Sequence, residues 1–161
     1  MQRPITSHQK KLSALCAIVG AESSSKELEK IEVSGIAQAS DSVLAGDLFI
    51  ALPGEKFHGA QFASDAISRG AVAVLTDAIG AKDIKGVPVL ISTNPRRAAG
   101  IASAWFYSEP MRDLYSVGVT GTNGKTTVTT LLHQIMTAAG RDSGLIGTVE
   151  TRIGVESIAS K

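Results

Sequence analysis

The chain has 161 residues, 43% of them hydrophobic and 19% charged, which is the composition of a folded globular protein rather than a disordered tail. Its formal net charge of +1 gives no electrostatic reason to expect nucleic acid or an anionic membrane as a partner. No apolar stretch approaches the ~20 residues of a membrane span, and residues 1–4 lack the apolar core of a signal peptide. The single cysteine, Cys16, cannot form an internal disulfide. We therefore expect a cytoplasmic protein.

Short apolar runs of the β type alternate with helical patterns along the first part of the chain, which favours an α/β architecture. A short helix is expected over residues 10–19, ended by Gly20, and another around residues 62–67, ended by Gly70. Strands are expected over four further runs, which are residues 30–36, 47–52, 71–76 and 87–92.

A third helix is expected to begin at Asn94, because an Asn side chain accepts hydrogen bonds from free N–H groups and Pro95 suits the first helical turn. Apolar residues then share one face of this helix: Ala98, Ile101, Ala102, Trp105 and Phe106. Glu109 and Pro110 break the pattern. We place a domain junction there, which gives a small mixed α/β domain over 1–110 and a second domain over 111–161.

The second domain is expected to open with a strand over residues 114–120 that runs into a glycine-rich loop. The helix after the loop carries an apolar stripe typical of packing on a sheet, made of Val128, Leu131, Leu132, Ile135, Met136 and Ala139. Gly140 ends this helix, and a strand is expected over 143–149. So few elements cannot close a parallel sheet, so we expect the truncated start of a parallel-sheet ATPase domain.

The glycine-rich loop is the strongest functional signal in the sequence. Glycines let the backbone curl so that successive N–H groups point at anionic oxygens, and the following helix adds its positive dipole end. Lys125 supplies a mobile charge for the β- and γ-phosphates of ATP, and the Thr126 hydroxyl is placed to bind Mg²⁺. The expected nucleotide-binding residues are Gly121, Thr122, Asn123, Gly124, Lys125, Thr126 and Thr127.

The loop departs from the generic phosphate-binding pattern at its first glycine. That pattern asks for Gly, four residues, and then Gly-Lys-Ser/Thr, but Val119 occupies the first position here. A glycine-rich turn with an exposed lysine is the alternative interpretation. The strand-to-helix context that we expect around the loop favours phosphate binding instead.

This form of the loop, Gly-x-Thr-Gly-Thr-x-Gly-Lys-Thr-Thr, resembles that of the Mur ligases and the related folylpolyglutamate synthases. Further segments resemble the branch of the Mur family that adds the third amino acid of the peptidoglycan stem. These are residues 46–54 (GDLFIALPG), His58-Gly59, residues 66–74 (AISRGAVAV), residues 145–148 (LIGT) and residues 152–154. The resemblance spans roughly residues 30–155.

The resemblance implies an ATP- and Mg²⁺-dependent ligase of peptidoglycan synthesis. It would join an amino acid to UDP-N-acetylmuramoyl-dipeptide through an acyl phosphate. It also implies that residues 1–110 bind the UDP-linked substrate. Relatives hold the uridine diphosphate near a serine placed like Ser40 and at a loop placed like Glu55, Lys56 and Phe57. Where many relatives have Asp-Ser-Arg this chain has Ala39, Ser40 and Asp41, and Ser40 as a turn residue with a solvated Lys56 stays an alternative.

Other functions remain open from the sequence. They are the UDP-N-acetylmuramoyl-tripeptide:D-Ala-D-Ala ligase, a folylpolyglutamate-synthase-like ligase, and a non-catalytic nucleotide-binding module. We expect a monomer, and no ligase turnover from these 161 residues alone. The sequence does not distinguish lysine from diaminopimelate as the added amino acid.

The histidines show no metal-ligand spacing. His133 lies off the apolar stripe and is expected to be solvated. For His58, both substrate contact and a place on the loop surface are open. Arg96 and Arg97 are expected on a solvated helix face, with contact to phosphate or to the second domain as the alternative. Cys16 is expected to be buried, and Trp105 to be part of the core.

Overall fold

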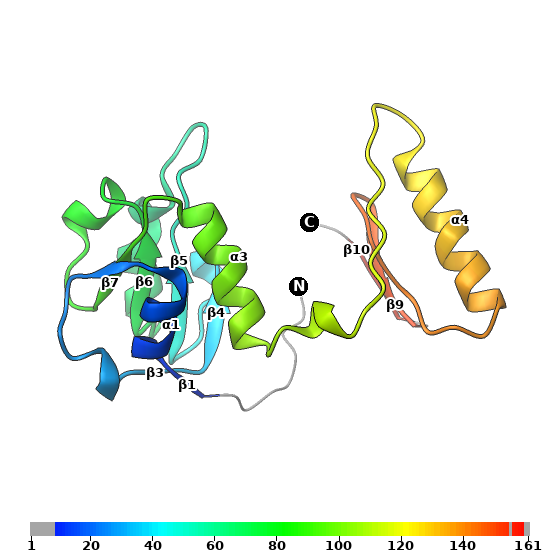
Figure 1. Ribbon diagram of the computed structural model, residues 1–161. Coiled ribbons are helices and arrows are strands. Elements are labelled where there is room, and N and C mark those ends of the chain that lie inside the picture. The colour runs from blue at the N-terminus through cyan, green and yellow to red at the C-terminus, as the bar shows by residue number, and fades with distance from the viewer. Residues whose placement is uncertain (1–8, 155, 160–161) are drawn as a thin grey trace. The chain divides into compact units, whose positions relative to one another are not determined.

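The computed structural model describes residues 9–154 and 156–159 (Figure 1). These residues form two compact units, one ending at Leu114 and the other beginning at Tyr115. None of the helices in the described ranges combines the length and the hydropathy needed to cross a lipid bilayer.

The first unit is built on a five-stranded sheet with the order β2-β7-β6-β5-β4. Its strands are β2 (Glu22–Ser23), β4 (Gly35–Ala37), β5 (Asp47–Ile50), β6 (Ala73–Thr76) and β7 (Val89–Ile91). The last four are parallel to one another, and β2 is antiparallel to β7. A separate antiparallel pair joins β1 (Lys10–Lys11) to β3 (Glu32–Val33).

The predicted strands are confirmed, with one division. The single strand expected over residues 30–36 is two short strands, because β3 pairs with β1 whereas β4 pairs with β5. Ser34 lies between them and donates its N–H to the Gly46 carbonyl (2.9 Å). A change of pairing partner leaves no mark in the apolar pattern, so the sequence did not reveal the division.

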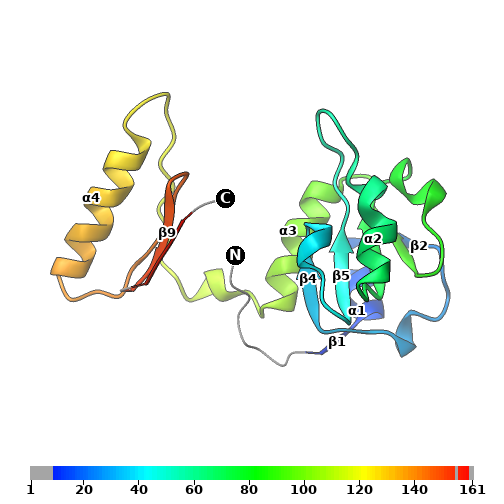
Figure 2. The same ribbon diagram turned by 180° about the vertical axis from the view of Figure 1, so that it is seen from behind.

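Helices cover both faces of this sheet. Helices α1 (Leu12–Val19) and α3 (Pro95–Phe106) lie on one face, and α2 (Ala63–Ser68) lies on the other (Figures 1 and 2). Leu48 and Ile50 of β5 belong to the core under α1 and α3, whereas Phe49 belongs to the core under α2. A strand buried on both faces has no polar side, which explains the continuous apolar run of β5.

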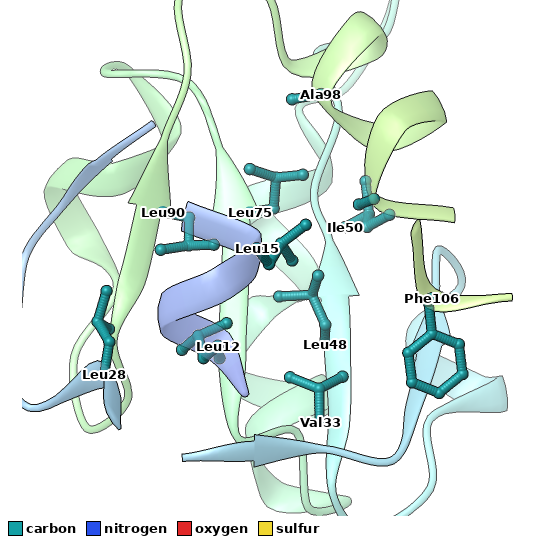
Figure 3. Packing of buried hydrophobic residues seen from close by; sticks show 12 residues of the cluster. Leu12, Leu15, Leu28, Val33, Leu48, Ile50, Leu75, Leu90, Ala98 and Phe106 are labelled. Atoms are coloured by element: carbon teal, nitrogen blue, oxygen red, sulfur yellow. The ribbon is translucent and has the colours of Figure 1, made fainter. Parts of the chain in front are cut away.

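The larger core cluster joins α1, α3 and the middle of the sheet (Figure 3). Leu12 and Leu15 of α1 are fully buried against Leu48, Leu75 and Leu90 of the strands. Because burial of one leucine contributes about 1.5–3 kcal/mol, these five side chains are a main stabilising feature of the unit.

The predicted helix ends are confirmed. Gly20 follows α1 in the left-handed conformation (φ 59°), and its N–H donates to the Ala17 carbonyl. The Asn94 side chain accepts from the Arg97 N–H (3.1 Å) at the start of α3, and Pro95 occupies the first turn. Local capping chemistry alone predicts these boundaries.

The second unit contains helix α4 (Lys125–Ala138) and a small antiparallel sheet of order β10-β9-β8. The strands are β8 (Gly144–Ile146), β9 (Glu150–Ile153) and β10 (Glu156–Ala159). The helix is confirmed and the strand predicted over 143–149 is shorter. The strand predicted over 114–120 is wrong, because this segment pairs with no strand in the described ranges. Apolar residues give a segment strand propensity, but a strand also needs a hydrogen-bonded neighbour.

The side of α4 that is buried is not the side that the apolar stripe predicts. Val128, Leu131 and Ile135 of the apolar stripe have exposed fractions of 49%, 52% and 63%. His133, predicted to be solvated, is instead buried, and its Nδ1 lies 2.8 Å from the Ser143 Oγ. The helix therefore contacts β8 with its histidine side. The apolar period was read correctly, but the period does not identify which side meets the neighbouring strand.

Candidate functional site

The loop before α4 owes its shape to two glycines. Gly121 has φ 149° and Gly124 has φ 78°, a region that L side chains rarely adopt. Gly124 precedes the first residue of the helix and directs the chain into it. A Cβ at position 124 would meet no atom within 4 Å, so the requirement for glycine is conformational and not one of space.

The backbone amides of this loop form a group of available donors. The first amide bonded to a carbonyl at the helix start is that of Val128, which donates to Gly124 (2.9 Å). The amides of 121–127 have no acceptor among the described residues, and all seven residues are exposed. Unsatisfied N–H groups and the positive end of a helix dipole are the features that suit a segment to bind an anion.

The Lys125 ammonium lies over the same loop. It donates to the Gly121 carbonyl and to the Thr122 carbonyl (3.3 Å). The ammonium thus lies beside the available amides. It can exchange its carbonyl acceptors for a stronger, anionic acceptor. Thr126 and Thr127 follow Lys125 in the first turn of the helix, and both are exposed. This donor set fits a polyphosphate, and an exposed threonine hydroxyl fits Mg²⁺, which prefers oxygen ligands.

In the first unit, the residues predicted to contact uridine diphosphate follow neighbouring strands. Ser40 comes just after β4, and Glu55–Phe57 come just after β5. These strands are parallel, with Ile36 opposite Leu48, so their carboxyl ends lie at one edge of the sheet. Ligands of open α/β sheets bind at that edge. The fold therefore brings both predicted segments to the same edge of the sheet.

Ser40 begins a 3-10 turn (Ser40–Ser42), and its hydroxyl is engaged within the protein. It forms a hydrogen bond with the Asp65 carboxylate, which also accepts from the Arg69 Nε (3.1 Å). The Ser40 bond, followed by that of Arg69, lowers the pKa of Asp65. A carboxylate only accepts, so the Ser40 hydroxyl proton is directed at Asp65. To donate to a diphosphate, Ser40 must exchange that partner.

The loop after β5 ends in an exposed tip. The Gly54 N–H donates to the Phe57 carbonyl (3.0 Å), which closes a tight turn around Glu55 and Lys56. Both side chains are exposed, as is Phe57 at 64%. One cation, one carboxylate and one aromatic ring are thus presented together at the carboxyl edge of the sheet.

Contacts with the rest of the unit hold both ends of this loop, at Pro53 and at His58. Pro53 and His58 form an isolated antiparallel bridge, and the Arg96 Nη2 of α3 donates to the Pro53 carbonyl (2.8 Å). Arg96 is exposed, as predicted, and this hydrogen bond gives it a partner at the base of the loop. His58 turns inward, where its Nε2 lies 3.1 Å from Asp77 Oδ1 and its Nδ1 accepts from the Ala60 N–H (3.0 Å).

Sequence reasoning missed Asp77. The residue directly follows β6, and its Oδ1 also accepts from the Gly80 N–H (2.8 Å). Its position at the end of a buried parallel strand was a usable signal, because that is where functional polar residues of such sheets gather. The hydrogen bond from Gly80, then that from His58, outweigh burial and lower the pKa of Asp77.

This lowered pKa predicts an acid sensitivity of the first unit. A carboxylate with a depressed folded-state pKa adds stability that is present above its unfolded pKa of about 3.9 and is lost as pH falls through the folded value. We therefore expect Asp77→Asn to lower the free energy of unfolding at pH 7. Below about pH 4, the difference in this free energy between the variant and wild type should become smaller. Urea unfolding between pH 7 and pH 3 measures this. A constant difference across that range would contradict it.

Comparisons with known proteins give a consistent result for both units. Residues 32–108 match the Mur ligase family catalytic domain, and residues 119–161 match the Mur ligase middle domain. The chain is 45% identical over 152 residues to the UDP-N-acetylmuramoyl-L-alanyl-D-glutamate--2,6-diaminopimelate ligase of Streptomyces avermitilis, and 43% identical over 134 residues to that of Listeria monocytogenes serotype 4b. These matches cover 93% and 83% of this chain.

The same matches cover 29% and 26% of those relatives, so the chain spans less than a third of the curated proteins it resembles. Among solved structures, MurF from Acinetobacter baumannii has a TM-score of 0.63 at 23% identity, covering 81% of this chain and 28% of that one. A diaminopimelate ligase structure has a TM-score of 0.64 at 21% identity, covering 95% and 30%. These likenesses show the fold.

Two segments separated by a short gap match two domains of one family, and curated relatives support the same assignment along most of the sequence. The shared α/β fold agrees with both. The chain belongs to the Mur ligase family.

Proposed function

We propose that this chain is part of an ATP-dependent ligase that adds the third amino acid to UDP-N-acetylmuramoyl-L-alanyl-D-glutamate in peptidoglycan precursor synthesis. The observation that carries the proposal is the loop over 121–127, with its available amides and the Lys125 ammonium. The names of the relatives make diaminopimelate the proposed incoming amino acid. A cytoplasmic location belongs to the same proposal, since ATP is a substrate.

In this reaction the substrate carboxylate attacks the γ-phosphorus of ATP, and the bond to ADP breaks. The amine of the incoming amino acid then attacks the acyl phosphate, forms the amide and releases phosphate with loss of a proton. Such transfer depends on positioning and charge neutralisation more than on covalent help from protein. The amides of 121–127 and Lys125 would bind the β- and γ-phosphates. Mg²⁺, held partly by Thr126, would supply further charge neutralisation.

Residues 1–110 are proposed to bind the UDP-linked substrate, and residues 111–161 to begin the ATP-binding domain. The carboxyl edge supports the first assignment, because Ser40 and the tip of Glu55, Lys56 and Phe57 follow adjacent parallel strands. Lys56 offers a charge suited to a diphosphate, and Phe57 an exposed ring surface for an apolar contact.

The test is amide formation by the full-length protein with ATP, Mg²⁺ and UDP-N-acetylmuramoyl-dipeptide, with mass spectrometry of the product. We expect one product with diaminopimelate, at a kcat/KM at least about tenfold above that with lysine, because a site built for a polar group rejects the analogue lacking it. In parallel, UDP-N-acetylmuramoyl-tripeptide with D-alanyl-D-alanine tests the neighbouring ligase activity. Product only from that second pair would overturn the proposal, and ATP binding without any product would favour a nucleotide-binding module.

A further inference from the structure

We propose that His58, tied to Asp77, is a positioning residue that holds the loop over 53–58 in the form that recognises the diphosphate of the UDP-linked substrate. The inference rests on the proposed function and adds a role for two residues that do not lie at the exposed tip. It depends on the hydrogen bonds of one imidazole ring, on the space around that ring, and on how the loop is anchored.

The two nitrogens of the His58 ring have different roles. Nδ1 accepts from the Ala60 N–H (3.0 Å), so in the neutral ring the proton is on Nε2. Nε2 then donates to Asp77 Oδ1 at 3.1 Å. Asp77 is itself oriented by the Gly80 N–H, which donates to the same oxygen (2.8 Å). One side chain thereby joins the end of the loop to the end of β6.

The ring occupies a space in which it has little freedom. A Cβ at position 80 would lie 2.5 Å from the His58 Cε1 and 2.5 Å from the Thr76 Oγ1. A Cβ at position 59 would lie 2.9 Å from the Leu52 nitrogen. The side chains of His58 and Asp77 are each 20% exposed. The ring therefore packs closely against Gly80, just after β6, while Gly59 brings the loop backbone close to Leu52.

The anchoring explains why this bond bears on substrate recognition. Arg96 of α3 holds the start of the loop at Pro53, and Asp77 holds its end at His58. Beyond these anchors the tip has the turn bond from Gly54 to Phe57, and its side chains are exposed. A tip fixed at its base loses less entropy when it binds a ligand, whereas a loosened tip binds the same ligand more weakly.

The experiment uses His58→Asn in the full-length enzyme. An asparagine Oδ1 reproduces the acceptor for the Ala60 N–H but does not reach Asp77, so it preserves the turn start and removes the tie. We expect the KM for the UDP-linked substrate to rise about three- to tenfold, the size of one hydrogen bond, with kcat and the KM for ATP within about twofold of wild type. His58→Gln, which restores a donor that can reach Asp77, should lie closer to wild type.

Two further variants separate the possible failures. Lys56→Ala removes a charge at the tip itself, and Asp83→Asn changes an exposed carboxylate near the same edge and should leave all constants unchanged. If Lys56→Ala raises the KM for the UDP-linked substrate and His58→Asn does not, the positioning role is wrong and the proposed function stands. If neither raises it, the diphosphate site is elsewhere and both assignments at this edge fail.

A structural explanation must also be distinguishable from positioning. If His58→Asn lowers kcat and the affinities for both substrates together, with a large loss of melting temperature, the side chain merely holds the fold and the inference is overturned. Should His58→Asn not fold, Asp77→Asn decides, since it keeps an acceptor for the Gly80 N–H and weakens the tie by removing its charge. A selective rise in the KM for the UDP-linked substrate is again the expected result, and an unchanged KM overturns the inference.

Discussion

Lys125→Ala in the full-length enzyme is expected to lower turnover about a hundred- to a thousandfold, the cost of losing one preorganised group that stabilises transition-state charge. The ammonium lies over the loop carbonyls of Gly121 and Thr122, next to the available amides. Its charge would follow the γ-phosphoryl group as negative charge shifts during transfer. Phosphate release and amide product, measured together under saturating substrates, give the effect on kcat.

A matched control for this variant is Lys85→Ala, because Lys85 is an exposed lysine outside the loop. It should retain wild-type turnover. The amides of 121–127 remain in Lys125→Ala, so ATP binding should weaken less than turnover falls. A Lys125→Ala enzyme with normal kcat would mean that the phosphates bind elsewhere.

Phe49→Ala is expected to destabilise the first unit by about 3–5 kcal/mol, the usual cost of deleting a buried aromatic ring. Phe49 is 1% exposed and packs in the cluster between β5 and α2, with Ala63, Ala66 and Val74. Its neighbours are small, so they cannot move in to fill the space that the ring leaves. Urea unfolding followed by circular dichroism gives the difference in the free energy of unfolding.

Phe57→Ala is the matched control for the core variant, since it removes the same ring from a side chain that is 64% exposed. Its effect on the free energy of unfolding should stay within about 0.5 kcal/mol. Equal losses in the two variants would show that the sheet face under α2 is not the closely packed core described above.

The first unit was largely predictable because its signals are local. Gly20, Asn94 and Pro95 predict helix ends through chemistry confined to one turn, and the apolar runs of β5, β6 and β7 predict strands buried on both faces. Strand pairing is not local. The division of residues 30–36 into two strands, and the unpaired segment over 114–120, depend on which neighbour is present.

The residues of the candidate site were also predictable only where their signals are local. The residues of the phosphate loop follow one another in sequence, so glycine spacing and the adjoining lysine predicted them together. His58, Asp77 and Gly80 come from separate segments that meet only after folding, and the pattern around each offers little sign of the others. His133 was misjudged for a related reason, because Ser143, its partner, lies beyond the helix end.

The contact between Gly80 and the His58 ring also bears on how sequences of this kind can diverge. A Cβ at position 80 would overlap both the His58 imidazole and the Thr76 hydroxyl, so a larger residue there requires that both neighbours change or move. In an alignment of related chains, a change at position 80 should therefore accompany changes at positions 58 and 76. A larger residue at 80 beside a retained histidine at 58 should be rare.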